Sequence, residues 1–284
     1  MKHLFFDFHT HSTASDGSLT PTELVREAAK AGLSGLALTD HDTVDGLEEF
    51  LAAAEHLGLM AVRGVEISLE HPGTMHLLGY NAAGGPGLPA SLSRLKAFRL
   101  ERNRLLHDKL DQLGYHLDWD KLLEKSGGGQ LGRPHFAAML VEEGFFPTVA
   151  DVFNHLLAKG QPGYVDKKRM SIDEGLAVII EAGWAPVLAH PVSLGLAPAD
   201  WPDFLAGLRA KGLTGLEVRH PSMGRDESDF FLGLARRFNL VPTAGSDFHG
   251  ASKPHIKLDW ARDNNPFGAE PMEELNRSSR SQAG

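Results

Sequence analysis

The sequence predicts an α/β fold interrupted by a mainly helical insertion. Its 284 residues are enough for one large α/β domain with an ample core, and for a unit of barrel size. Short apolar runs alternate with amphipathic helical patterns along most of the chain, which is typical of βαβ units around a parallel sheet. This alternation stops in the middle of the chain. We therefore expect an α/β part at 1–90 and 160–284, and a helical insertion at 91–159 that covers the substrate site.

The individual elements follow from local signals. The run LFFDF at 4–8 is typical of a buried strand. A capping-box spacing occurs at Thr20–Glu23, where Pro21 occupies the first helical position, and again at Ser171–Glu174, so a helix should begin at each. About six further strands are predicted by the segments GLALTDHD, LMAVRGVEI, MHLLGYN, APVLAHP, LTGLEVRHP and LVPTAGSDFHG. The polar end, from about Asp263, is expected to bury little surface and to fray.

The composition limits the classes of ligand and partner that the chain can bind. The formal charge of -9 and a sequence pI of about 5.9 argue against a broad surface for duplex nucleic acid but leave room for a local basic pocket, so any nucleotide partner should be small or single-stranded. The chain has no cysteine, so any metal must be bound through nitrogen and oxygen. The N-terminus lacks the apolar run of a secretory signal, and no window is long enough to span a membrane. We therefore expect a cytoplasmic protein with no membrane partner.

Side chains that can bind metals lie at or just beyond the ends of the predicted strands. They are His9, His11, Asp40, His41, Glu66, His76, His190, His220, Asp247 and His249. In a parallel barrel these ends share one face, where side chains distant in sequence converge. A single histidine is more often a surface or core residue than a ligand. Here, however, seven of the chain's 15 histidines lie at strand ends, together with Asp16, Glu66 and Asp247. This concentration favours a metal site.

The spacing of these residues suits chelation. Residues two apart in a strand point to the same side, so His9 with His11, and Asp247 with His249, can each offer two donors. The candidates exceed what one ion can use, which predicts two or three ions. Glu66 is the candidate bridging ligand. Imidazole and carboxylate donors accept manganese, zinc or iron, and we expect manganese.

The ordered segments FHTHSTASDG, LALTDHDTVDG, GVEIS, AHP and AGSDFHG resemble the PHP (polymerase and histidinol phosphatase) family. The segment GRPHFAAML, with the helix before it, resembles the stand-alone subgroup related to nucleoside 3',5'-bisphosphate phosphatases and the TrpH-type exoribonuclease. The resemblance covers nearly the whole chain outside the insertion. It implies a distorted seven-stranded (β/α) barrel that holds three divalent ions.

The resemblance also implies which residues hold each ion. One ion would be held by His9, His11, Glu66 and Asp247, a second by Glu66, His76 and His190, and a third by Asp16, His41 and His249. Asp16 stands where histidinol phosphatases of the family often have histidine, which weakens that assignment. Asp16, Glu66 and Asp247 are thus the catalytic candidates, and His220 could protonate the leaving oxygen. Asp40 could be a ligand or could support a neighbouring imidazole.

The insertion should select the substrate. The subgroup resemblance favours Arg102, Asn103, Arg133 and His135 as contacts to a second phosphate or a ribose, because guanidinium groups match phosphate oxygens. Lys168 could join them from a basic cluster with Lys167 and Arg169. A solvated helix face is the favoured interpretation of the remaining basic residues on the first insertion helix, Arg94, Lys96, Arg99 and Arg104.

These features predict a metal-dependent phosphoesterase that removes the 3'-phosphate from nucleoside 3',5'-bisphosphates such as pAp, which yields AMP. The alternatives are a 5'-to-3' exoribonuclease on short 5'-phosphorylated RNA and a histidinol phosphate phosphatase. A C–N hydrolase of the amidohydrolase type also begins with a paired-histidine strand, but it leaves Asp16 and His41 unexplained. A non-catalytic binding module would not need so complete a ligand set.

Overall fold

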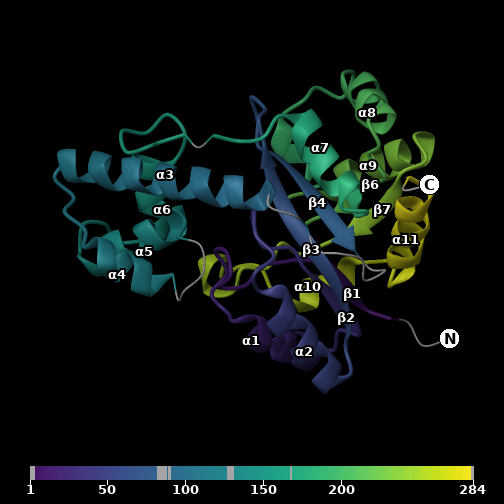
Figure 1. The fold of residues 1–284 in the computed structure, drawn as a ribbon, viewed down its shortest axis with the longest axis horizontal. Coiled ribbons are helices and arrows are strands. Elements are labelled where there is room, and N and C mark those ends of the chain that lie inside the picture. The colour runs from purple at the N-terminus through teal and green to yellow at the C-terminus, as the bar shows by residue number, and fades with distance from the viewer. Residues whose placement is uncertain (1–3, 82–87, 89–90, 127–130, 167, 283–284) are drawn as a thin grey trace.

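The computed structural model describes residues 4–81, 88, 91–126, 131–166 and 168–282. Within these ranges one sheet has seven strands, hydrogen-bonded in chain order: β1 (Phe6–Thr10), β2 (Gly35–Leu38), β3 (Met60–Leu69), β4 (Met75–Asn81), β5 (Ala185–Leu188), β6 (Gly215–Arg219) and β7 (Val241–Ala244) (Figure 1). Beyond β7 the chain returns to β1, where the His11 backbone N–H donates to Phe248 O at 2.9 Å. The sheet is therefore a nearly closed, distorted barrel, and the predicted α/β barrel is confirmed.

Strand β4 departs from the expected parallel arrangement. The pairs among β1, β2 and β3 are parallel, as are those among β5, β6 and β7, whereas β4 is antiparallel to both of its neighbours. Only residues 70–74 separate β3 from β4, too few for the crossover that parallel neighbours require. The reversal places His76, at the start of β4, opposite Ser68 near the end of β3. His76 thereby reaches the edge where the parallel strands end.

Helices surround the barrel. They are α1 (Pro21–Lys30), α2 (Leu47–Leu57), α7 (Ile172–Glu181), α8 (Trp201–Ala210), α9 (Arg225–Arg237) and α10 (Asp259–Asn264), with short 3-10 turns η2 (Pro191–Leu194) and η3 (Gly250–Ser252). Both predicted capping boxes are present, since Thr20 and Ser171 each accept from the backbone of the glutamate three residues later. No helix in the described ranges combines the length and the apolar character that a membrane span needs.

The C-terminal region forms a packed helix, so the prediction that it frays was wrong for α11 (Glu270–Gln282). Leu275 is 2% exposed, and it packs with Met272 on an apolar cluster that includes Phe6, Phe8 and Val187 from the strands. In Figure 1, α11 lies beside β7. Two apolar residues three apart on one helical face were enough to dock a segment whose composition is mostly polar.

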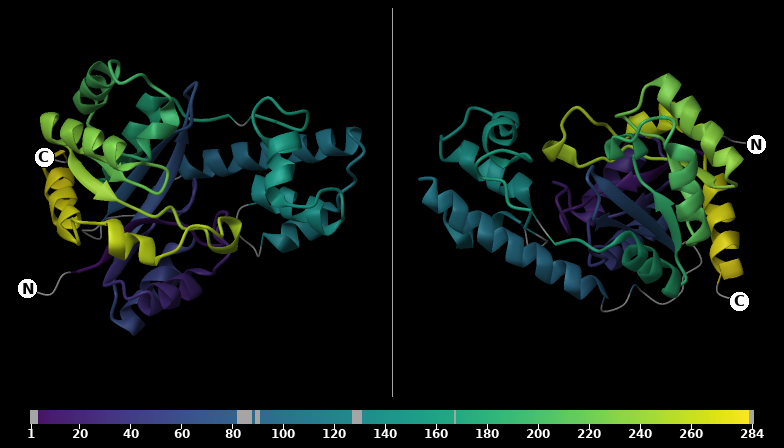
Figure 2. Two further views of the ribbon diagram at one scale, coloured as in Figure 1. Left: turned by 180° about the vertical axis from the view of Figure 1, so that it is seen from behind. Right: turned by 90° about the horizontal axis from the view of Figure 1, so that it is seen from above.

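A second group of helices lies at one end of the molecule. It comprises α3 (Ser91–Gln112), α4 (Trp119–Lys125), α5 (Arg133–Glu142), α6 (Val149–Val152) and the π-helical turn η1 (Phe153–Leu157). Figure 2 shows these elements at the end opposite α11 and both termini. They share their own apolar cluster, which includes Leu106, Leu122 and Phe136. Most of the glycine- and proline-rich segment at 82–89, and residues 127–130, lie outside the described residues.

Candidate metal centre and cavity

Glu66 lies among buried imidazoles. Strand β3 extends beyond the end of β2, so Glu66 forms an isolated bridge with His41 at the barrel edge. The side chain of Glu66 is 1% exposed. Imidazole nitrogens lie 2.7–3.3 Å from its two carboxylate oxygens, and they belong to His9, His11, His41, His76 and His190. The predicted bridging residue thus lies between histidines from several strands.

Asp247 faces the same group from the segment after β7. Its Oδ1 lies 3.2 Å from His11 Nε2 and 3.5 Å from His9 Nε2, and its Oδ2 lies 3.5 Å from His220 Nε2 and 2.5 Å from Lys253 Nζ. The backbone of Asp247 has a φ of 55°, in the left-handed region that most side chains avoid. Such conformations cluster at functional sites, where the surroundings must hold them in place.

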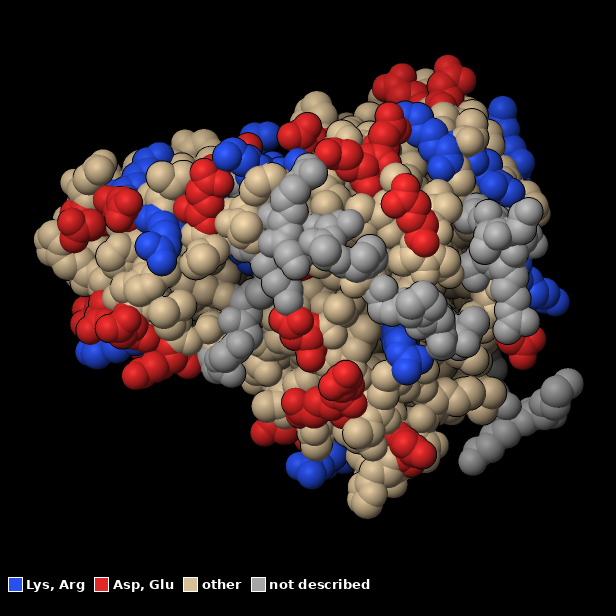
Figure 3. Space-filling model, in the orientation of Figure 1, with Lys and Arg blue, Asp and Glu red and all other residues tan. Residues whose placement is uncertain are grey.

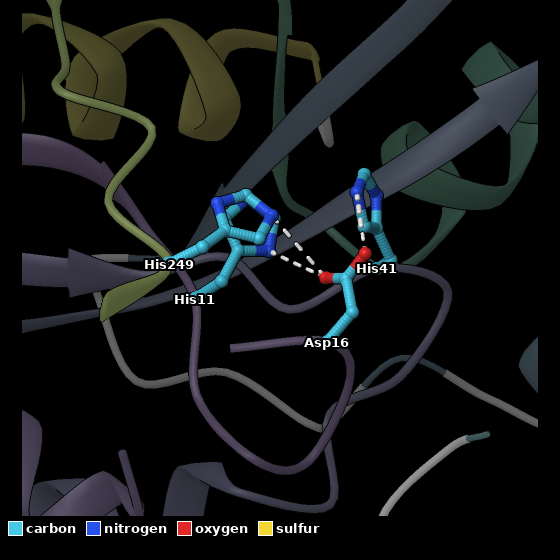
Figure 4. Close-up of side chains that lie close together, drawn as sticks. All are labelled: His11, Asp16, His41 and His249. Carbon is cyan, nitrogen blue, oxygen red and sulfur yellow. Dashed lines mark ion pairs between the residues drawn. The ribbon is translucent and has the colours of Figure 1, made fainter. Parts of the chain in front are cut away.

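Asp16 is the third carboxylate of the site. Figure 4 shows its carboxylate between the ring of His41 on one side and the rings of His11 and His249 on the other. Its Oδ1 lies 3.2 Å from His249 Nε2 and 4.0 Å from His11 Nδ1, and its Oδ2 lies 3.9 Å from His41 Nε2. The rings of His11 and His249 stack with centroids 4.0 Å apart.

The donor atoms fit divalent ions. Buried nitrogens of His9, His11, His41 and His220, and Oε2 of Glu66, make no hydrogen bond. Donors about 2.1 Å from one ion lie roughly 3.0–3.4 Å from each other, close to the separations found here. Three groups have donors within 4.8 Å of one another: His9, His11, Glu66 and Asp247; His11, Asp16, His41 and His249; and His41, Glu66 and His76. These groups contain eight of the nine residues predicted as ligands, and the ninth, His190, lies beside them with its Nε2 2.9 Å from Glu66 Oε1.

The surroundings keep the central carboxylates ionised. Burial alone would raise the pKa of Glu66, but His41, His76 and His9 outweigh it and hold that pKa well below its usual range. Burial is likewise outweighed at Asp247, whose pKa is lowered mainly by Lys253 and His249. Ionised carboxylates are the form that binds a cation.

Buried carboxylates outside these three groups stabilise the segments that carry the metal donors. Asp40 accepts from the Ser12 backbone N–H at 2.8 Å and from the hydroxyls of Ser12 and Ser15 at 2.6 and 2.5 Å, so it fixes the loop that leads to Asp16. The sequence left Asp40 as either a ligand or a support for a neighbouring imidazole, whereas these hydrogen bonds join it to the serines of the loop.

Two other buried carboxylates, Asp7 and Glu217, were not singled out from the sequence. Asp7 accepts from Ser246 beside Asp247, and Glu217 contacts His9 and His190. An acidic residue inside an otherwise apolar strand segment, as in FFDF and GLEV, is a signal that could have found both, because a buried charge must have partners.

A cavity of about 610 Å³ connects this centre with a group of arginines. Its lining includes Asp16, His41 and His76 from the barrel, and Arg99, Arg102, Arg133 and Arg169 from the insertion side. Arg102 is 5% exposed, and burial together with the neighbouring guanidinium groups lowers its pKa to about 9. Positive charges gathered at low exposure repel one another, so this wall is suited to an anion.

The other predicted substrate contacts, Asn103, His135 and Lys168, do not line this cavity. Asn103 donates from Nδ2 to Leu131 O at 2.7 Å, and Nδ1 of His135 accepts from the Gly132 backbone N–H at 2.9 Å. These contacts fix the start of α5, which carries Arg133. Lys168 is exposed and lies 3.2 Å from Glu101, outside the cavity wall.

The expectation of a solvated helix face was wrong for Arg99. Its side chain is 7% exposed, and its Nη2 lies 2.7 Å from Asp42 Oδ2. The turn of α3 that carries Arg99 meets the barrel edge beside His41, which periodicity within the helix alone does not reveal. Arg104, on the same helix, is exposed as expected. The side chains of Arg94 and Lys96 lie outside the described residues.

Comparison with known proteins agrees with this geometry. The model of the PHP domain family matches residues 7–168. A 3',5'-nucleoside bisphosphate phosphatase from Chromobacterium violaceum is 35% identical over 248 residues, which are 86% of each chain. A 5'-3' exoribonuclease from Haemophilus influenzae is 33% identical over 86% of this chain and 89% of its own. A phosphoribosyl 1,2-cyclic phosphate 1,2-diphosphodiesterase from Eggerthella lenta is 34% identical over 88% of this chain and 97% of its own.

Solved structures show the same fold. A candidate metal-dependent phosphoesterase from Bifidobacterium adolescentis superposes with a TM-score of 0.84 at 30% identity and covers 96% of both chains. A Chromobacterium violaceum structure described as an amidohydrolase, with bound sulfate and no metal, gives a TM-score of 0.78 at 34% identity, over 89% of this chain and 91% of its own. Together with the seven-stranded barrel and its cluster of histidines and carboxylates, these relationships show that the chain belongs to the PHP domain family as a metal-dependent phosphoesterase.

Proposed function

We propose that this protein removes the 3'-phosphate from nucleoside 3',5'-bisphosphates such as pAp and releases the nucleoside 5'-monophosphate. The observation that carries the proposal is the cavity lined both by the metal centre and by four arginines. A substrate with two phosphates can place one at each wall. The nucleoside 3',5'-bisphosphate phosphatase at 35% identity supports this choice.

In this proposal the ligand sets are those that the family resemblance implies. His9, His11, Glu66 and Asp247 would hold one ion, Glu66, His76 and His190 a second, and Asp16, His41 and His249 a third. Glu66 could serve two ions because its Oε2 faces His9 and His11 and its Oε1 faces His76 and His190. When bound, such ions, with manganese as the expected metal, supply hydroxide from water at neutral pH and neutralise charge on phosphoryl oxygens.

His220 is the proposed proton donor to the leaving oxygen. Its Nδ1 lies 2.7 Å from the Ser222 hydroxyl, which can accept from the protonated ring, so the imidazolium that acts as the acid carries its second N–H on Nε2. That Nε2 faces Asp247 at 3.5 Å and makes no hydrogen bond. The proton is thus directed into the metal centre, where an alkoxide would leave.

Arg102 and Arg133 are the proposed contacts to the 5'-phosphate, and Arg99 and Arg169 complete the positive wall. Guanidinium groups bind phosphate oxygens through paired N–H donors. Asn103 and His135 contribute indirectly, by fixing the start of α5. Lys168, although predicted as a contact, lies outside the wall and is left out of the proposed set.

The size and charge of the cavity favour a mononucleotide over a polymer. A volume of about 610 Å³ is typical of a site for one small ligand. In Figure 3, acidic and basic side chains are mixed among the coloured residues of the face shown. A 5'-to-3' exoribonuclease acting on short RNA is the second candidate, because a relative with that name is 33% identical over most of its length.

Phosphate release by manganese-loaded protein tests the proposal when pAp, a 5'-phosphorylated RNA oligomer and histidinol phosphate are offered side by side. We expect fast release from pAp and slow or no release from the other two. Stepwise mononucleotide release from the oligomer, at a higher kcat/KM than for pAp, would replace the proposal with the exoribonuclease.

A further inference from the structure

Glu217 is a buried carboxylate that belongs to none of the groups of metal donors described above. It lies in β6 between Leu216 and Val218, which pack in the apolar core, and it is 0% exposed. Its Oε1 lies 3.1 Å from His9 Nδ1, and its Oε2 accepts the backbone N–H of His190 at 2.6 Å. Both oxygens of this buried charge are therefore used on residues of the metal centre.

The contact with His9 determines which ring nitrogen is free. A carboxylate only accepts hydrogen bonds, so Nδ1 of a neutral His9 ring must carry the proton, and Nε2 keeps its lone pair. This Nε2 makes no hydrogen bond, and it lies 3.3 Å from Glu66 Oε2 and 3.5 Å from Asp247 Oδ1. The tautomer that Glu217 selects is thus the one that a cation beside Glu66 and Asp247 requires.

The contact with His190 acts on the backbone. His190 has a φ of 24°, a conformation that a residue with a side chain adopts only when its surroundings hold it. From this backbone its Nε2 reaches Glu66 Oε1 at 2.9 Å. One carboxylate on β6 therefore holds two histidines from different strands, His9 within β1 and His190 just after β5.

We propose that Glu217 is a positioning residue that fixes the ring of His9 and the backbone of His190 for ion binding, without contacting ion or substrate itself. This proposal rests on the ion centre proposed above. Its test therefore uses ion binding and ring protonation rather than turnover.

Glu217→Gln is the most informative variant because it keeps the shape and removes one acceptor. The backbone N–H of His190 can only donate, so the amide oxygen must face it, and the amide NH₂ then faces Nδ1 of His9. This arrangement favours the ring with its proton on Nε2, which blocks the nitrogen that faces Glu66.

Asp7→Asn is the matched control. Asp7 is also 0% exposed, and its Oδ1 accepts from the backbone N–H groups of His9 and Ser246 at 3.1 and 2.9 Å. Its Oδ2 accepts from the Ser246 hydroxyl at 2.6 Å, and that hydroxyl can turn to accept from an amide instead. The control therefore changes a buried charge in the same region without a contact to an imidazole ring.

The experiment titrates zinc into the ion-free protein by calorimetry and records proton–nitrogen spectra of the histidine rings in the zinc-loaded protein. For Glu217→Gln we expect one ion to bind about 10- to 100-fold more weakly, and the Nδ1–H signal of His9 to be lost. Asp7→Asn should bind zinc within about threefold of wild type, an affinity difference below 1 kcal/mol, and should keep that signal.

The possible outcomes distinguish a failure of the proposed ion centre from a failure of the proposed role of Glu217. A wild-type protein that binds no zinc would refute the centre itself. Wild-type zinc binding with an unchanged affinity and an intact His9 signal in Glu217→Gln would overturn the role of Glu217 alone. If Glu217→Gln does not fold, the spectrum of the wild-type protein tests the role of Glu217, because it shows which ring nitrogen of His9 carries the proton. With the His9 signal assigned from its absence in His9→Gln, a proton on Nδ1 supports the proposal and a proton on Nε2 overturns it.

Discussion

The barrel edge and the insertion line the same cavity, but they hold their charged groups in different ways. At the barrel edge, carboxylates and imidazoles are fixed by strand ends and by further buried carboxylates such as Asp40. On the insertion, guanidinium groups project from α3 and α5, and the charged groups around Arg102 are mainly those of Arg99, Arg133 and Arg169. The comparison indicates that the barrel edge suits cation binding and catalysis, whereas the arginines of the insertion suit anion binding. Substitutions should therefore lower kcat at the barrel edge and raise KM at the arginines.

The largest effect is expected at Asp247. Asp247→Asn keeps the size of the side chain but removes the charge that faces His9 and His11. Loss of several kcal/mol of metal-assisted stabilisation should lower kcat by about a thousandfold or more. Steady-state phosphate release measures this, and circular dichroism should show an unchanged fold. Activity within tenfold of wild type would contradict the proposed centre.

Removal of ions should act on activity and stability together. A chelator should abolish phosphate release, and manganese should restore it. Because ions bind only the folded centre, manganese at about 1,000 times its Kd should stabilise the fold by about 4 kcal/mol, seen as a higher Tm. An unchanged Tm on adding manganese would argue against ions held by Glu66 and its neighbours.

Arg99 should matter to the fold as well as to the site. Arg99→Met leaves Asp42 as a buried carboxylate without its guanidinium partner, which should lower the free energy of unfolding by about 3 kcal/mol. Urea denaturation measures the loss. Arg104→Met, an exposed position on the same helix, is the control and should change it by less than about 0.5 kcal/mol. Equal stability of the two variants would show that the Arg99 pair is unimportant.

Arg102 should bind substrate without affecting the fold or the chemistry. Arg102→Gln should reduce kcat/KM for pAp by roughly 10- to 150-fold, mainly through KM, because hydrogen bonds to a charged group contribute about 1.5–3 kcal/mol. For adenosine 3'-phosphate, which lacks the 5'-phosphate, the same variant should behave like wild type. An equal loss on both substrates would mean that Arg102 does not contact the 5'-phosphate.

The smallest effect is expected at Lys168, because its side chain is 65% exposed and its partner is Glu101. Lys168→Ala should change kcat/KM for pAp by less than about twofold, as exposed ion pairs contribute little. A tenfold loss of kcat/KM would mean that Lys168 contacts the substrate, although its side chain lies outside the cavity wall.

The sequence was most informative for side chains whose place in the fold follows from the end of a strand. The predicted ligands meet because their strands end at one edge, where His190 reaches Glu66 and the reversed β4 brings His76. Glu217 and Asp7 were overlooked because their partners, the ring of His9 and the segment after β7, are distant in sequence. In these cases the environment of the residue follows from tertiary contacts rather than from local pattern.

Helix faces were harder to assign than strand ends. Arg99 and Arg104 have the same chemistry on one helix, yet only Arg99 meets the barrel. Lys168 and Arg169 are adjacent, yet only Arg169 lines the cavity. The packing of α11 through Leu275 was likewise hidden by its polar composition.

The most direct test of the account is a crystal structure of the manganese-loaded protein with AMP, using anomalous scattering to locate the ions. We expect manganese between Glu66 and its surrounding histidines, with the 5'-phosphate of AMP against Arg102 and Arg133 in the same cavity. Manganese bound elsewhere, or a nucleotide phosphate outside the arginine wall, would contradict the claim that one cavity joins the metal centre to a phosphate-binding site.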